Sequence, residues 1–122
     1  MLGPMEKVTI YHNPYCNSSV NAVAIAEDLG VDHEVVIYRK NPPDRATLEW
    51  LVDHLEDEPT ALVRRDSLFK KLELSDDDVA TKEQIVDTLL AHKMLLQRPV
   101  VVRGDRAIVG RPKGRVHDLL SE

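Results

Sequence analysis

The sequence predicts a single α/β domain with a helical segment inserted between its second strand and a C-terminal β-hairpin. Two short runs rich in β-branched and aromatic residues, 8–11 and 33–38, flank a segment with helical spacing. Two further β-rich runs, 100–102 and 107–109, are separated by a turn signal, and residues 44–92 between the two parts are mostly helical in pattern. If the first two strands pair in parallel, the crossover between them is right-handed.

The first strand, 8–11, is followed by the turn residues Asn13 and Pro14. We expect a helix to begin at Ser18 or Ser19 and to end at Gly30. Its buried face is predicted to carry Val20, Val23, Ala24 and Leu29. The second strand, 33–38, is predicted to end at the break formed by residues 41–43.

The inserted segment contains two clear helix starts. Asp44 is predicted to cap one helix, and Thr81 with Gln84 has the spacing of a capping box ahead of another. A short helical turn is expected at 59–64. The two apolar faces are predicted to consist of Leu48, Leu51, Val52 and Leu55, with Trp50 beside them, and of Ile85, Val86, Leu89 and Leu90.

The last part of the chain predicts a hairpin and a helix. Pro99 precedes the third strand, and Gly104 with Asp105 forms a two-residue turn to the fourth. Pro112 stands where the first residue of a final helix is expected. That helix is predicted to pack on the sheet through Val116, Leu119 and Leu120.

Composition limits the classes of function. The chain has 122 residues, 43% of them hydrophobic, which suits one domain with one core. It has neither an apolar stretch near the roughly 20 residues of a membrane span nor a signal-peptide pattern, so we expect a cytoplasmic protein without membrane association. A net charge of −5 without a basic stripe disfavours nucleic acid. Residues 1–4 are predicted to be an expression remnant or a short disordered extension before Met5, with the domain spanning 5–122.

Cys16 is the single cysteine, and it lies between the first strand and the first helix. Backbone N–H groups and the helix dipole favour a thiolate at such a position, whereas an isolated cysteine is often only a small buried hydrophobe. The turn and cap residues around Cys16 favour a loop and hence a reactive thiol. One sulfur cannot form an internal disulfide, so a redox-active Cys16 requires a second thiol from outside the chain. The histidines show no metal-ligand spacing, and no metal site is expected.

Five segments, taken with the order of the elements, resemble one family over about residues 6–120. They are His12-Asn13-Pro14-Tyr15-Cys16, Asn41-Pro42-Pro43, Ala61-Leu62-Val63-Arg64, Arg98-Pro99-Val100-Val101-Val102 and Arg111-Pro112. They are similar to the signature segments of the glutaredoxin-coupled arsenate reductases, the ArsC family, whose domain has a thioredoxin-like fold. Spx-type proteins share that fold.

The resemblance implies an oxidoreductase of arsenic detoxification that reduces arsenate to arsenite. It places the nucleophile on Cys16 with His12 as its catalytic neighbour. It also implies an oxyanion site, arsenate or a similar anion, formed by Arg64, Arg98, Arg111, Ser19 and Asn13. Guanidinium groups suit such a ligand because they keep their charge and bind oxygens in pairs.

The resemblance further implies how the thiol is regenerated. Glutathione or an equivalent small thiol acts as co-substrate, glutaredoxin is the protein partner, and no cofactor is tightly bound. Ser19 stands where a dithiol enzyme carries its resolving cysteine, which agrees with an external reductant. Pro99 is the structural proline of the site, and the Arg98–Pro99 bond is expected to be cis, with Arg98 turned toward Cys16.

Two departures from the family leave alternatives open. Val20 stands where arsenate reductases commonly carry an arginine, and the chain ends at Glu122, where those enzymes often continue with a charged tail. One alternative is therefore a glutathione-linked thiol oxidoreductase without arsenate activity. Another is an RNA polymerase-binding regulator of the Spx type, although these usually carry two cysteines in a Cys-x-x-Cys motif.

Overall fold

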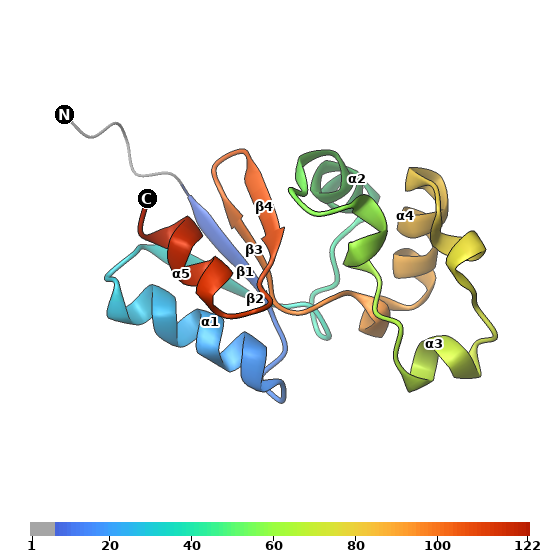
Figure 1. The fold of residues 1–122 in the computed structure, drawn as a ribbon, viewed down its shortest axis with the longest axis horizontal. Helices are drawn as coiled ribbons and strands as arrows, with labels where there is room; N and C mark the ends of the chain where they lie inside the picture. The colour runs from blue at the N-terminus through green and yellow to red at the C-terminus, as the bar shows by residue number, and fades with distance from the viewer. Residues whose placement is uncertain (1–6) are drawn as a thin grey trace.

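The computed structural model describes residues 7–122, which form a four-stranded sheet with helices on both faces (Figure 1). The strands are β1 (Val8–His12), β2 (His33–Ile37), β3 (Val100–Arg103) and β4 (Arg106–Val109). Their order across the sheet is β2-β1-β3-β4, so β2 and β4 form its edges. The predictions for residues 1–4 and for a start at Met5 lie outside the described residues.

Strand pairing brings distant segments to one end of the sheet. β1 pairs with β2 in parallel, and α1 (Asn17–Asp28) makes the crossover between them. β3 runs antiparallel to β1, and β4 antiparallel to β3 through the predicted turn at Gly104 and Asp105. The end of β1 therefore lies beside the start of β3 and the end of β4. Cys16, Arg98 and Arg111 follow or precede these strands at that shared end.

The two faces of the sheet are buried in separate hydrophobic clusters. Val8, Ile10 and Val101 belong to a cluster with α1 and α5 (Gly114–Leu120), which we call the α1–α5 core. Val100 and Val102 belong to a cluster with the inserted helices, which we call the insertion core. This alternation is the period of two expected when both faces of a strand are covered.

The inserted segment is helical, as predicted. It consists of α2 (Arg45–His54), η1 (Pro59–Leu62), α3 (Ser67–Lys71), η2 (Asp76–Val79), α4 (Lys82–Ala91) and η3 (Lys93–Leu95), where η marks a 3₁₀ helix. The Asp44 carboxylate accepts a 2.9 Å hydrogen bond from the Thr47 N–H, and Thr81 forms the expected capping box with Gln84. Both predicted helix starts are confirmed. On α4 the buried face includes Leu89 but not Leu90, which is 41% exposed.

The start of α1 differs from the prediction. The N-cap is Cys16, not Ser18 or Ser19. Cys16 has the extended backbone of an N-cap, and its carbonyl accepts the first helical hydrogen bond, from the Val20 N–H at 3.0 Å. The helix therefore begins before either serine can cap it, and both serines lie in its first turn.

The buried face of α1 also differs. Val20, Ala24 and Leu29 are exposed, and the buried residues are Ser19, Ala22 and Ala26, with Val23 packed at the margin of the core. Small side chains allow the helix backbone to approach the sheet closely, whereas the prediction placed the larger apolar side chains inside. The helix is rotated by about one residue, or roughly 100°, from the predicted orientation.

Two further boundaries are corrected. β2 ends at Ile37, and Tyr38 lies in the following turn rather than in the strand. α5 begins at Gly114 instead of Pro112, because the Pro112 carbonyl accepts a hydrogen bond from the Arg115 N–H in a turn that precedes the helix.

Replacement of Gly110 by alanine tests the packing at the shared end of the sheet. A Cβ atom at Gly110 would lie 2.7 Å from Pro99 Cγ and 2.8 Å from Val116 Cγ2, so these groups must move. We expect Gly110→Ala to lower the free energy of unfolding in urea by about 1–3 kcal/mol. Gly114→Ala is the control, since nothing lies within 4 Å of its Cβ position, and it should change stability by less than about 0.5 kcal/mol. Equal effects of the two substitutions would contradict the close packing.

Candidate active site

Cys16 lies in a tight loop between β1 and α1. The Tyr15 N–H donates to the side-chain oxygen of Asn13 at 2.9 Å, and Pro14 stands between them with its backbone φ restricted by the ring. The thiol is partly buried and reduced, and it lies at the first turn of α1. The loop therefore presents one sulfur at a helix N-terminus.

A buried pair of polar side chains fixes this loop. Ser19 is fully buried and His12 is 9% exposed, and His12 Nδ1 lies 2.9 Å from Ser19 Oγ. The Asn13 N–H also donates to Ser19 Oγ at 2.9 Å. Burial lowers the pKa of His12, and hydrogen bonding at Ser19 opposes this only in part, so the imidazole is neutral at neutral pH. A neutral His12 supplies no positive charge to Cys16.

The pKa of Cys16 lies below its ordinary value, as predicted. Burial alone would raise the pKa of Cys16. Hydrogen bonds from the Ser19 N–H, the Arg98 guanidinium, the Ser18 N–H and the Arg111 guanidinium lower the pKa by more than burial raises it. Ser18 and Ser19 are the second and third residues of α1, where N–H groups have no partner within the helix. The thiolate is thus stabilised by helix N–H groups and by two arginines.

Arg98 and Arg111 meet at the sulfur. Arg111 donates from one terminal guanidinium nitrogen to Cys16 Sγ at 3.3 Å and from Nε to the Arg98 carbonyl at 2.9 Å. The Arg98–Pro99 bond is cis, as the resemblance implied. Arg98 Nε is buried and has no hydrogen-bond partner in the structure, so one donor beside the thiol is unused.

Arg64 reaches the same place from the inserted segment. Its N–H donates to the Leu95 carbonyl at 2.8 Å, and one guanidinium nitrogen lies 3.4 Å from an Asp66 oxygen. Burial lowers the pKa of Arg64, and the positive charges of Arg98 and Arg111 lower it as well, while Asp66 opposes them. The charge of Arg64 therefore interacts with those of Arg98 and Arg111, although the groups that act on the pKa of Cys16 include only the latter two arginines.

Arg65 faces away from this cluster. Its guanidinium donates to the Thr60 and Val63 carbonyls, both at 2.7 Å, and its Nε donates to Asp76 at 3.1 Å. It also lies 5.3 Å from the centre of the Phe69 ring. Of the two adjacent arginines, the structure brings Arg64 to the site and keeps Arg65 in the insertion.

Tyr38 follows β2 at the end of the sheet where the site lies, although the sequence predicted it only as the end of a strand. It is fully buried, its hydroxyl has no hydrogen-bond partner in the structure, and it acts electrostatically on Arg64. Its place in the sequence could have indicated this. Tyr38 follows β2 and Cys16 follows β1, and the residues after two parallel strands lie at the same end of a sheet.

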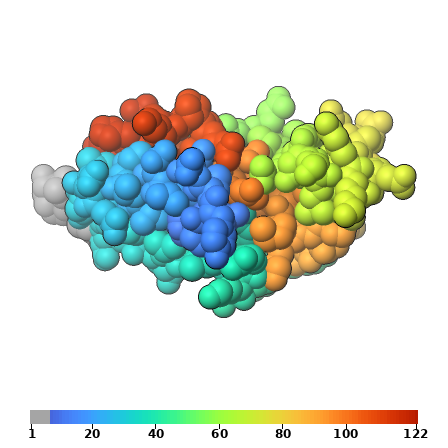
Figure 2. All heavy atoms as spheres, turned by 90° about the horizontal axis from the view of Figure 1, so that it is seen from below, coloured from blue at the N-terminus to red at the C-terminus, as the bar shows by residue number. Residues whose placement is uncertain are grey.

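Figure 2 shows the face that contains this end of the sheet, where the loop after β1 (blue) meets the segments before β3 (orange) and after β2 (teal). Tyr15 is 79% exposed and Val20 45% exposed, and they flank the Cys16 loop. The Arg39 guanidinium lies 5.3 Å from the centre of the Tyr15 ring. Val20 leaves its part of this surface uncharged.

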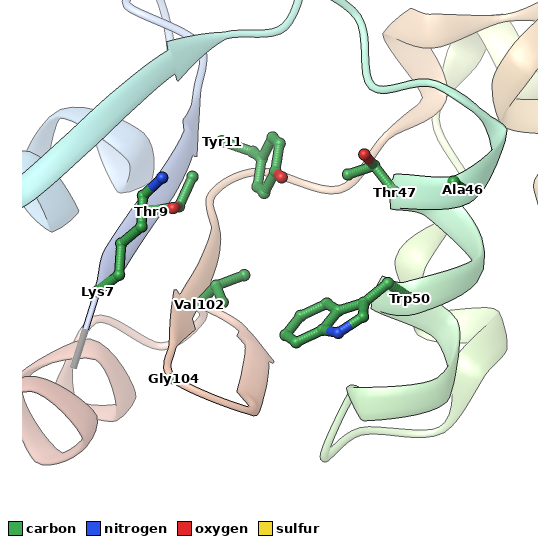
Figure 3. A pocket seen from close by; sticks show the side chains of 8 residues that line it. All are labelled: Lys7, Thr9, Tyr11, Ala46, Thr47, Trp50, Val102 and Gly104. Atoms are coloured by element: carbon green, nitrogen blue, oxygen red, sulfur yellow. The ribbon is translucent and has the colours of Figure 1, made fainter.

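A separate groove of about 370 Å³ lies on the face of the sheet that the inserted helices cover, between β1, β3 and α2 (Figure 3). Thr9 and Tyr11 line it from β1, Val102 from β3, and Thr47 and Trp50 from α2. It contains neither the thiol nor the three arginines. The Cys16 site and the groove are therefore distinct.

Two further classes of feature are absent from residues 7–122. No group of three or more His, Cys, Asp or Glu side chains is arranged to hold a metal ion. No helix in this part of the chain combines the length and the apolar character that a membrane span requires.

Comparison with known proteins gives consistent matches along most of the chain. The model of the ArsC family matches residues 11–119. An arsenate reductase of Escherichia coli is 33% identical over 119 residues, which cover 97% of this chain and 84% of that protein. The uncharacterized protein YfgD of E. coli K12 is also 33% identical, over 94% of this chain and 98% of its own length. The structure of an arsenate reductase from Vibrio cholerae superimposes with a TM-score of 0.79 at 31% identity, covering 96% of this chain and all of that one. The predicted thioredoxin-like fold is confirmed.

The rate of Cys16 alkylation by iodoacetamide as a function of pH tests the electrostatics. We expect a midpoint below about 8.5, because helix N–H groups and two arginines stabilise the thiolate. Removing either guanidinium, in Arg98→Ala or Arg111→Ala, should raise the midpoint by about half a unit to one unit. Arg45→Ala is the control, since Arg45 pairs with Asp87 on the exposed insertion. An ordinary midpoint in the unmodified protein would remove the activated thiol.

Ser19→Ala tests the buried polar pair. It leaves the Asn13 N–H and His12 Nδ1 without their shared partner, so the free energy of unfolding should fall by about 1–3 kcal/mol. Ser18→Ala keeps the backbone N–H at the neighbouring position and should cost less than about 0.5 kcal/mol in the same urea titration. A neutral result for Ser19→Ala would show that the loop does not depend on this pair.

Proposed function

The chain belongs to the ArsC family, and we propose that it is an arsenate reductase that uses Cys16 as nucleophile and an external thiol as reductant. The observation that supports this most directly is that Arg98 and Arg111 act on one activated sulfur, while the charge of Arg64 interacts with both of these arginines. Three guanidinium groups repel one another, and a tetrahedral oxyanion with several acceptor oxygens is the kind of ligand that offsets this repulsion.

The proposed first step is attack of the Cys16 thiolate on arsenic. A sulfur–arsenic bond forms, and one arsenate oxygen leaves as water after protonation. Arg64, Arg98 and Arg111 are the groups that hold the remaining oxygens. The backbone N–H groups of the Cys16–Ser19 loop contribute at the start of α1.

The second step transfers two electrons to arsenic. A thiolate such as that of glutathione attacks the Cys16 sulfur, and the electron pair of the sulfur–arsenic bond moves to arsenic, which leaves as arsenite. The product on the protein is a mixed disulfide between Cys16 and the small thiol. A second thiol, which we assign to a glutaredoxin, attacks this disulfide and restores the Cys16 thiolate. Two thiols are oxidised for each arsenate reduced, and the reaction is placed in the cytoplasm, where both thiols are kept reduced.

The remaining site residues are proposed to position the reacting groups. His12 and the Ser19 hydroxyl hold the loop, and the Asn13 side chain closes its turn. The substrate contact of Ser19 is through its backbone N–H, since its hydroxyl is buried against His12 and Asn13. Pro99 stands between Arg98 and the start of β3 and is proposed as the structural proline of the site.

Val20 favours a second candidate function, a glutathione-linked thiol oxidoreductase without arsenate activity. The side chain is exposed beside the Cys16 loop and adds no charge to the anion site. An activated thiol with fewer positive charges around it still exchanges with disulfides, because that reaction needs a thiolate and access.

Arsenite production by the purified protein tests the proposal directly. With arsenate, glutathione and a glutaredoxin, we expect turnover that Cys16→Ser abolishes. Loss of one charge-assisted hydrogen bond, in Arg64→Ala or Arg111→Ala, should lower turnover by about ten- to a hundredfold. Arg45→Ala again serves as the control. Arsenite is separated from arsenate by chromatography and quantified by mass spectrometry.

Val20→Arg separates the two candidate functions. It should raise the apparent affinity for arsenate if the anion site is otherwise complete, because it adds a positive charge at the start of α1. If the unmodified protein reduces glutathione mixed disulfides but not arsenate, and Val20→Arg produces no arsenate turnover, the thiol oxidoreductase takes the place of the proposal.

A further inference from the structure

The outer edge of β4 is covered by the segment that follows α2. β4 is an edge strand, so alternate backbone groups along it have no partner in the sheet. The Glu56 N–H donates to the Ala107 carbonyl at 2.8 Å, next to a parallel bridge between Leu55 and Ala107. Two residues further along β4, at Val109, side chains rather than backbone groups bind the edge of the strand.

At Val109 both backbone polar groups are bound by one ion pair. The Val109 N–H donates to one oxygen of Asp57 at 2.9 Å, and a single guanidinium nitrogen of Arg115 donates to the Val109 carbonyl at 2.9 Å. The same nitrogen lies 2.7 Å from the other Asp57 oxygen. The two side chains are only 21% and 33% exposed, so solvent screens this pair less than a surface pair. We call this arrangement the Val109 clamp.

The Val109 clamp is two residues from an arginine of the active site. The Val109 carbonyl also accepts a 2.9 Å hydrogen bond from the Arg111 N–H, and the Gly110 N–H donates to the Pro99 carbonyl at 2.8 Å. The Arg111 side chain then reaches Cys16 Sγ. A continuous series of hydrogen bonds therefore runs from the clamp to the sulfur.

We propose that Asp57 and Arg115 are positioning residues for the reaction at Cys16: they hold the end of β4 so that Arg111 stays beside the thiolate. The proposal deepens the proposed function, and it depends on that function only for the thiolate being the reactive group. Asp57 comes from the loop after α2 and Arg115 from α5, so the clamp also joins the two layers that cover opposite faces of the sheet. Neither residue touches the sulfur in the structure, and both act through Val109 and Arg111.

The pH dependence of Cys16 alkylation tests this role, because a purely structural pair would not change it. Asp57→Asn and Arg115→Met should each raise the alkylation midpoint. The rise should not exceed that of Arg111→Ala, which is about half a unit to one unit. Arg115→Lys should keep the midpoint close to that of the unmodified protein, since one nitrogen of Arg115 makes both clamp contacts and a lysine nitrogen can replace it. Far-ultraviolet circular dichroism checks that each variant is folded before the midpoints are compared.

Glu56→Gln is the matched control. Glu56 precedes Asp57 in the same loop and pairs with Arg106 at 2.6 Å, but its side chain makes no contact with Val109 among those found in the structure. It should leave the alkylation midpoint unchanged. A shift in Glu56→Gln as large as that in Asp57→Asn would show a general charge effect and would overturn the proposal.

A double substitution tests the route through Arg111. In an Arg111→Ala background, Asp57→Asn should shift the midpoint no further, because the residue through which it acts is gone. A full additional shift there would overturn the proposal, and so would a loss of stability in Asp57→Asn with an unchanged midpoint. The alkylation assay contains no arsenate, so a failure of the clamp and a failure of arsenate reduction remain distinguishable.

Discussion

Like charges repel, yet Arg64, Arg98 and Arg111 share one end of the sheet, and much of the structure serves to hold them there. Each is anchored through its backbone at a different place. The Arg98 carbonyl accepts a hydrogen bond from Arg111 Nε, the Arg111 N–H donates to the Val109 carbonyl, and the Arg64 N–H donates to the Leu95 carbonyl. Burial lowers the pKa of Arg64, and the positive charges of Arg98 and Arg111 lower it as well. The Cys16 thiolate is stabilised by the positive charges of Arg98 and Arg111.

Different groups supply the charge that stabilises the Cys16 thiolate and the contacts that hold its loop in place. Charge comes from Arg98 and Arg111 and from helix N–H groups, while position comes from the buried His12 and Ser19. The imidazole is thus better suited to hold the loop in place than to act as a cation. The Ser19 hydroxyl has a structural use that a cysteine side chain at this position would serve poorly, because sulfur is a weaker hydrogen-bond partner.

The strands, the hairpin turn and the capped helices follow from local patterns, and the sequence predicts them well. The face of α1 does not follow, because hydrophobicity favoured valine and leucine for the interior, whereas close helix–sheet contact selects Ala22 and Ala26. The gathering of arginines around Cys16 was accessible only through the family resemblance. The pairing of Asp57 with Arg115, 58 residues apart, leaves no local signal in the sequence, and only the structure shows that both side chains bind the edge of β4.

Among residues 7–122, the sheet separates two hydrophobic cores that have no buried residue in common, and the proposed anion site takes residues from the elements around both. The thiol is carried by the start of α1 in one layer, and Arg64 by the insertion in the other. Local opening of either layer would separate sulfur from guanidinium without unfolding the whole domain. A bound oxyanion would then act as a noncovalent cross-link, slowing hydrogen exchange in both layers together, by an amount set by its concentration relative to its dissociation constant.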